Sequence, residues 1–203
     1  MPDSGALAAR WPLPDGGDLR DALLAAWSAP DRGYHDLRHL AEVLDRLAEL
    51  AAAGVEHEAA TTALAAWFHD AVYDAAPGDE ERSAKWATEA LPPLVGATVA
   101  AEVARLVLVT ERHRPEPGDL DGAALTDADL AILATSAQRY EEYAAAVRRE
   151  YAHVSDTDFR AGRAAVLREL VAKPALFHTA YAFERWEARA RVNVTAELAR
   201  LTG

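Results

Sequence analysis

Three short segments of the sequence place histidine or aspartate beside strongly apolar residues. The first, 34–39, reads YHDLRH and puts His35 and His39 four residues apart. On a helix, side chains at this spacing lie on the same face. The second, 67–70, reads WFHD and ends an apolar run in an adjacent His and Asp. The third, 125–130, reads LTDADL. Burying ionisable groups among apolar ones is costly without a partner, and one metal ion would serve all three segments.

The two aspartates of the third segment are not equivalent. On a helix, side chains two residues apart point about 200° away from each other, so only one of them can face a given ion. Asp127 stands where we expect a helix to begin, and its side chain is well placed to accept a backbone N–H bond as the N-cap. Asp129 is then the better ligand. The sequence therefore predicts one metal site, made by His39, His69, Asp70 and Asp129.

The amino-acid composition limits the kind of metal site. The sequence has no cysteine, so thiolate ligands are excluded and the donors must be imidazole and carboxylate. Taken singly, histidines beside apolar runs are more often hydrogen-bonded core residues than ligands, and it is their combination that favours a metal. Two histidines and two aspartates suit one divalent ion such as Mn, Fe, Co, Ni or Zn. Mg is also compatible, although imidazole is not its preferred ligand.

Helices must bring these segments together. Apolar residues recur every three or four positions through nearly the whole sequence, and no stretch alternates as a strand would. We expect an all-α bundle of about nine helices in a single domain over residues 1–203, with a core at about 27–172 and a C-terminal helix at 179–201 packed on it. The predicted helices lie at about 18–29, 37–53, 58–69, 79–91 and 97–110, then from about 127, around 140–151, at 156–172 and at 179–201.

Charge and hydropathy exclude several classes of partner. With 21 Lys and Arg against 33 Asp and Glu, the net charge is −12, which repels a polyphosphate backbone. No run approaches the roughly 18 consecutive apolar residues of a membrane span, and the first residues lack a basic region followed by an apolar one. We expect a cytoplasmic protein with no membrane and no nucleic acid polymer as partner. The oligomeric state stays open.

The order of these residues, a His, an adjacent His-Asp pair and a distant Asp, resembles the HD superfamily of metal-dependent phosphohydrolases. The segments YHDLRHL, WFHDAVYD, DEERSA, TDADLAIL, YEEYAAAVRREY and WEARARVNVTAEL further resemble a bacterial family of predicted HD phosphohydrolases of about this length. The resemblance covers roughly residues 27 to 200. It implies an HD-domain-like helical bundle that hydrolyses a phosphate ester, with His39, His69, Asp70 and Asp129 as the metal ligands.

The same resemblance implies a role for His35. In related cyclic-nucleotide phosphodiesterases, a motif beginning Tyr-His-Asn supplies the histidine that protonates the leaving oxygen, and Tyr34-His35 matches it although Asp36 replaces the Asn. The alternative is that His35 only orients Asp36 or a neighbouring backbone group. Two-metal members, including oxygen-using di-iron enzymes, carry two further histidines before the last Asp, where this sequence has only His113. One metal ion is therefore expected.

These expectations describe a hydrolase that uses a metal-activated water. His35 and Asp70 are the expected catalytic residues, and the substrate is a nucleotide or another small phosphorylated metabolite. The main alternative is a non-catalytic, metal-stabilised helical module that binds a phosphorylated ligand, and a di-iron oxygenase is less favoured. An open metal position beside His35 would favour chemistry, whereas a closed four-ligand shell would favour structure.

Several further residues are candidates for substrate binding. Arg112 and His113 belong to the densest positive cluster near the predicted site and could grip a phosphate, although a solvated helix end explains them equally well. Asp74 and Glu81 flank the loop after the His-Asp pair and could accept a proton or hold a histidine in one tautomer, and plain surface charge is the alternative. The set is completed by Arg32 and Tyr34.

Overall fold

In the computed structural model, which describes residues 4–203, the three- and four-residue spacing of apolar side chains produces helices along nearly the whole chain. The described residues form ten α-helices and one 3-10 helix, and none of them lies in a strand. The predicted all-helical bundle is therefore confirmed. The helices are α1 (Ser4–Ala8), α2 (Gly17–Trp27), α3 (Leu37–Ala52), α4 (Ala59–Phe68), α5 (Asp79–Ala90), α6 (Pro92–Thr110), α7 (Leu120–Leu130), η1 (Ala131–Ala134), α8 (Ala137–Glu150), α9 (Asp156–Ala172) and α10 (Ala180–Thr202).

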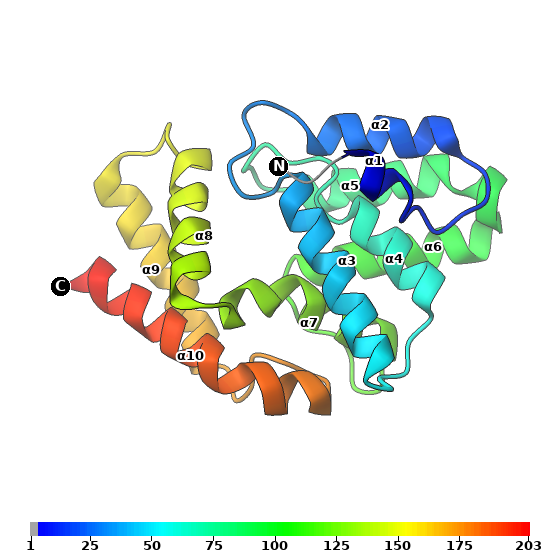
Figure 1. Ribbon diagram of the computed structural model, residues 1–203. Coiled ribbons are helices and arrows are strands. Elements are labelled where there is room, and N and C mark those ends of the chain that lie inside the picture. Colours follow the sequence, from blue (N-terminus) through cyan, green and yellow to red (C-terminus); the bar gives the residue numbers. More distant parts are fainter. Residues whose placement is uncertain (1–3) are drawn as a thin grey trace.

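The helices form two groups that α7 and η1 connect. In Figure 1, α1 to α6 lie on the right, α8 to α10 lie on the left, and α7 runs between them. Helix α3 packs against α4 and α7, α5 packs along α6, and α10 packs against α9 and η1. The three helices that carry the predicted ligands, α3, α4 and α7, are therefore mutual neighbours near the middle of the molecule.

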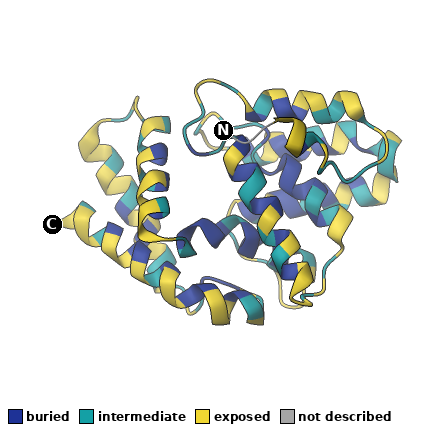
Figure 2. Ribbon diagram, viewed as in Figure 1, coloured by how far each residue is buried: buried dark blue, intermediate teal, exposed yellow. Residues whose placement is uncertain are grey.

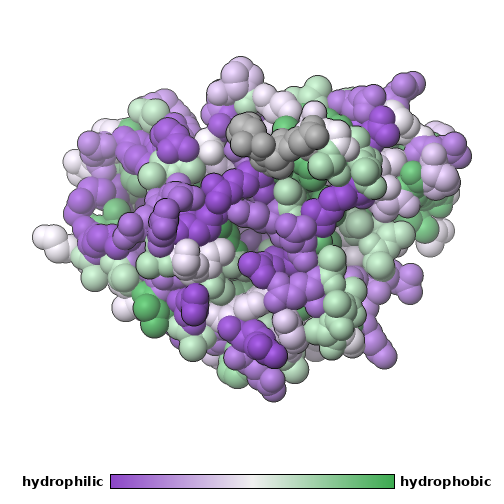
Figure 3. Space-filling model, in the orientation of Figure 1, coloured by the Kyte–Doolittle hydropathy of each residue, from purple (hydrophilic) through white to green (hydrophobic). Residues whose placement is uncertain are grey.

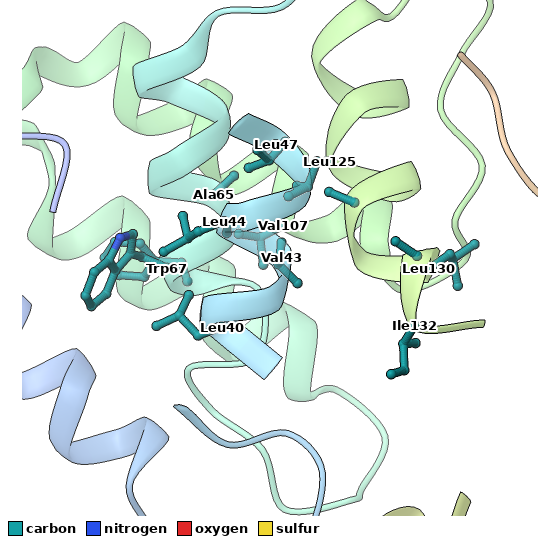
Figure 4. Packing of buried hydrophobic residues seen from close by; sticks show 14 of the residues in the cluster. Leu40, Val43, Leu44, Leu47, Ala65, Trp67, Val107, Leu125, Leu130 and Ile132 are labelled. Atoms are coloured by element: carbon teal, nitrogen blue, oxygen red, sulfur yellow. The ribbon is translucent and has the colours of Figure 1, made fainter. Parts of the chain in front are cut away.

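The apolar stripe of α3 forms the centre of the core. Leu40, Val43, Leu44 and Leu47 are buried at spacings of three and four residues, and they pack towards side chains of α4, α6 and α7 (Figure 4). Each such leucine contributes about 1.5–3 kcal/mol through burial of its side chain. Figure 2 shows the buried residues concentrated where these helices meet, while the outer faces of α9 and α10 are largely exposed.

Helix α6 is the one described helix that is long and apolar enough to cross a membrane by length and composition. Its apolar residues are not consecutive, because Glu102 and Arg105 interrupt them. Arg105 is paired with Glu102 and Asp119, and Gly96 breaks the helical backbone with φ 81°. The helix packs against α4, α5 and α7, as a core helix of a bundle does. On the face seen in Figure 3, hydrophilic residues are spread widely between apolar ones.

Helix α7 begins earlier than the sequence predicted, and this changes the role of Asp127. The N-cap is Asp119, whose side chain accepts the N–H of Gly122 at 2.9 Å, so the helix starts at Leu120 instead of near 127. The prediction that Asp127 caps this helix is wrong. Its buried carboxylate instead accepts the N–H groups of His178 and Thr179, at 2.7 and 2.8 Å, and so fixes the start of α10.

Candidate metal centre

Three helix ends position the predicted ligands. His39 lies in the first turn of α3, where the side chain of the N-cap Asp36 accepts backbone N–H bonds, including that of His39 at 3.3 Å. His69 is the C-cap of α4, and Asp70 follows it directly. Asp129 lies in the last turn of α7. The two imidazoles are each 1% exposed, so neither is hydrated as a surface histidine would be.

The ligand atoms of these four residues converge. The Nε2 atoms of His39 and His69 are 3.1 Å apart, and the Oδ2 of Asp70 lies 3.5 and 3.1 Å from them respectively. The Oδ1 of Asp129 lies 3.2 Å from His39 Nε2 and 3.7 Å from His69 Nε2. Donors about 2.1 Å from one ion are about 3.0 Å apart at right angles and about 3.4 Å apart in a tetrahedron. His39, His69 and Asp70 thus form a buried group able to hold a metal ion, and Asp129 adjoins it.

Neighbouring groups fix the orientation of the ligands. His69 Nδ1 lies 2.8 Å from the carbonyl oxygen of Ala66, which can only accept, so Nδ1 carries a hydrogen and Nε2 is the nitrogen that faces the other candidate ligands. The second oxygen of Asp129, Oδ2, lies 2.8 Å from His113 Nε2. His113 thus supports the aspartate from outside the ligand group, and its backbone adopts the left-handed region with φ 50°.

The charges of the centre stabilise one another. Burial alone would raise the pKa of Asp70, but the imidazoles of His69 and His35 hold that pKa well below its usual value. Burial likewise opposes the charged form of Asp129, yet hydrogen bonds to His113 and His39 keep its pKa well below the usual range. Both carboxylates are therefore charged and available to a cation.

His35 lies next to the centre and is held by Glu150, at the end of α8. Its Nδ1 is 2.9 Å from Glu150 Oε2, and its Nε2 is 4.0 Å from Asp70 Oδ2. The other oxygen of Glu150 accepts the backbone N–H groups of Gly33, Tyr34 and His35, at 3.0, 2.7 and 2.8 Å. Glu150 therefore holds both the loop and the imidazole. Gly33 permits this approach, because a Cβ there would collide with the carbonyl oxygen of Ala146.

Glu150 should make the protein acid-sensitive. Burial opposes its charged form, but its contacts with His35 lower the pKa from 4.5 to about 2, and the side chain is only 2% exposed. A depressed carboxyl pKa stabilises the fold above the unfolded value and loses that contribution as the pH falls through the folded value. The size is about 3 kcal/mol at pH 7. We expect Glu150→Gln to lower the free energy of unfolding by about this amount at pH 7 and by less than half of it at pH 3. A constant difference in denaturant titrations would contradict this.

A cavity of about 610 Å³ opens from the candidate centre towards α8 and α9. His35, Asp70, His113 and Asp129 line it on the side of the centre. Its other lining residues come largely from η1, α8 and α9. The volume lies in the range of small-molecule sites, so two of the predicted ligands, Asp70 and Asp129, border a space that can hold more than an inorganic phosphate.

The structure brings some of the predicted substrate-binding residues to this cavity and not others. Tyr34 and His113 line it. Arg32, Asp74, Glu81 and Arg112 do not. The guanidinium of Arg32 donates instead to the carbonyl oxygens of His35, Asp70 and Ala71, so it ties the loop before α3 to the loop after α4.

The other three candidates that do not line the cavity are turned to solvent. Asp74 pairs with Arg82 at 2.7 Å, and the side chain of Arg112 is 76% exposed. Glu81 is exposed as well.

Most of the cavity wall was not anticipated from the sequence. The helical spacing of these residues marks them as packing residues and does not reveal which of them border a cavity. Glu150 lies 115 positions from His35, and no local pattern links the two. The unanticipated lining residues include Tyr73, Glu80, Thr110, Glu111, Tyr143, Tyr151, Phe159 and Arg163.

Comparisons with known proteins place no relative beside this chain: no family model, no curated protein and no solved structure matches it.

Proposed function

We propose that this protein is a metal-dependent phosphohydrolase of the HD type, acting in the cytoplasm on a small phosphate ester. The observation that supports the proposal most is that two imidazole nitrogens lie 3.1 Å apart and that a carboxylate oxygen of Asp70 and one of Asp129 each lie 3.1–3.7 Å from both nitrogens, beside a cavity. The net charge of −12 argues against a nucleic acid polymer as substrate.

His39, His69, Asp70 and Asp129 would hold the ion in this proposal. A divalent cation bound by them would lower the pKa of water towards neutrality and polarise a phosphoryl oxygen. The donor set fits this task, because His69 directs Nε2 at the centre and both aspartates are charged. Four protein ligands also leave positions open on an ion that accepts five or six.

His35 would protonate the leaving oxygen. Because the charged carboxylate of Glu150 can only accept, Nδ1 of His35 must carry a hydrogen, and Nε2 is left to give a second proton towards the cavity. Glu150 acts through His35: it fixes the ring and keeps a hydrogen on Nδ1, so that Nε2 is the nitrogen left for proton transfer.

Tyr34 would bind the phosphoryl group. Its replacement by phenylalanine is then expected to raise the stability of the fold and to lower the activity. The side chain is 5% exposed and lines the cavity, yet its hydroxyl has no hydrogen-bond partner within residues 4–203. A buried unsatisfied hydroxyl destabilises a fold, so Tyr34→Phe should raise the free energy of unfolding by about 1 kcal/mol. If the hydroxyl donates to the substrate, the same variant should lower kcat/KM about tenfold. Unchanged kcat/KM would remove Tyr34 from the site.

The proposed function is tested by metal analysis of the purified protein, followed by phosphate release from a panel of nucleotides and simple phosphate esters. The proposal expects about one transition-metal ion per chain and turnover that disappears in His69→Ala and Asp70→Ala. Lys85→Ala is a matched surface control, since Lys85 pairs only with the exposed Glu89 among the described residues. Metal without turnover would favour the non-catalytic binding module, and no metal under any loading condition would reject the central inference.

A further inference from the structure

We infer that the substrate is a singly phosphorylated ester whose alcohol carries a flat or branched apolar group. This inference rests on the proposed function, and it names the class of molecule that the cavity would accept. Three features of the cavity carry it: its apolar wall, the charges of its lining, and an open space beside one glycine of α9.

The apolar wall faces the candidate centre across the cavity. Leu133 comes from η1, Val147 from α8, and Phe159, Val166 and Leu170 from α9, whereas His35 and Asp70 lie in the loops before α3 and after α4. A phosphate held at the centre would thus direct its ester group towards hydrocarbon. A small polar alcohol such as glycerol would gain nothing from this wall, whereas an aryl or branched alkyl group would bury apolar surface against it.

The charges of the lining select against further phosphates. Glu80, Glu111 and Asp158 all line the cavity, and Arg163 is the one Lys or Arg residue among its lining side chains. Arg163 is already engaged: its Nε lies 2.9 Å from Glu197, and its Nη2 donates to the hydroxyl of Tyr143 at 3.0 Å. Sites for diphosphates and triphosphates supply free arginine or lysine donors, which this wall lacks. The lining can therefore neutralise the charge of one phosphate at the centre.

Gly162 keeps part of the cavity open. It lies inside α9 and lines the cavity, and a Cβ added to it would meet no atom within 4 Å. A larger side chain can therefore occupy the open space without moving neighbouring residues. Leucine also favours a helix interior more than glycine does. Gly162→Leu is thus a variant that narrows the cavity while the protein stays folded.

The first experiment ranks substrates and ligands by the size of the apolar group. The substrates are methyl, butyl, phenyl and naphthyl phosphate, together with AMP, ADP and ATP. We expect kcat/KM to rise by about fourfold for each methylene equivalent buried, and to fall at least tenfold from AMP to ADP. Calorimetric binding of methylphosphonate and naphthylmethylphosphonate is a second readout that needs no turnover, and it should show the same preference.

The second experiment compares Gly162→Leu with Ala161→Leu, which adds the same side chain at an exposed position that does not line the cavity. Gly162→Leu should reduce the ratio of kcat/KM for naphthyl phosphate to that for methyl phosphate by at least tenfold, while Ala161→Leu should leave this ratio unchanged. Equal kcat/KM across the series, a preference for ADP, or identical behaviour of the two variants would overturn the inference. If every ester were hydrolysed with a similar kcat/KM, the inference would be wrong while the proposed function would stand. Ranked phosphonate binding without hydrolysis of any ester would support the ligand class and reject the hydrolase.

Discussion

Asp129→Ala should lose the bound metal and all measurable phosphate release, whereas Asp127→Ala should keep both and lose stability. Oδ1 of Asp129 lies 3.2 Å from His39 Nε2, at the point where the donors meet, while Asp127 contacts the start of α10. Removing a group that only supports a ligand typically costs 10- to 100-fold in metal affinity, so removing a ligand should cost more than a hundredfold.

The two aspartate variants act as controls for each other, because both lie on α7 two residues apart. For Asp127→Ala we expect a loss of about 2–3 kcal/mol in the free energy of unfolding, since two N–H groups lose a charged acceptor. Metal content measured by elemental analysis and unfolding measured in denaturant separate the two effects. Retention of metal by Asp129→Ala, with loss in Asp127→Ala, would reverse the assignment.

His35→Gln should keep the metal and lower turnover by about a hundredfold or more, which is the usual contribution of a general acid. The loss should depend on the substrate. An aryl phosphate whose phenol leaves readily needs little protonation and should lose least, whereas an alkyl phosphate should lose most. A merely structural histidine would lower both alike. The measurement is kcat for a series of leaving groups, with metal content determined on the same samples.

Glu150→Gln is the matched variant for this measurement. It keeps an acceptor for the backbone N–H groups of the loop but removes the charge that faces His35. We expect a smaller loss with the same dependence on the leaving group, because the ring stays in place while Nδ1 loses its charged hydrogen-bond acceptor. Full activity of His35→Gln towards alkyl phosphates would exclude His35 from the reaction.

Much of the fold could be predicted because helical periodicity is a local property. The stripe from Leu37 to Leu50 lies within α3, and α9 begins and ends where the sequence predicted. The start of α7 was misplaced because Asp119, Asp121 and Gly122 resemble a turn, while the N-cap bond that makes them helical is visible only in the structure. The short α1 and η1 were missed for want of a periodic pattern.

The candidate site, like the fold, could be predicted from the sequence only in part. The ligand types and their order could be read from the sequence, since His39 and the His-Asp pair stand beside buried apolar residues. The sequence could not show which residues, far apart along the chain, bind one another. Asp127 looked like a local cap and instead binds the start of α10, and Arg32 looked like a phosphate ligand and instead binds carbonyl groups. Such pairings depend on tertiary distance, which periodicity does not encode.

The position of Glu150 on α8 affects the order in which the protein would lose its activity and its metal during denaturation. All four candidate ligands lie between residues 39 and 129, whereas the residue that holds the loop of His35 belongs to the group α8 to α10. Local opening of those C-terminal helices would release the proton donor while the ligand set stays assembled. On gradual denaturation, catalysis would then disappear before the metal does, and the intermediate stage would be a metalloprotein with an intact ion site and an untethered acid.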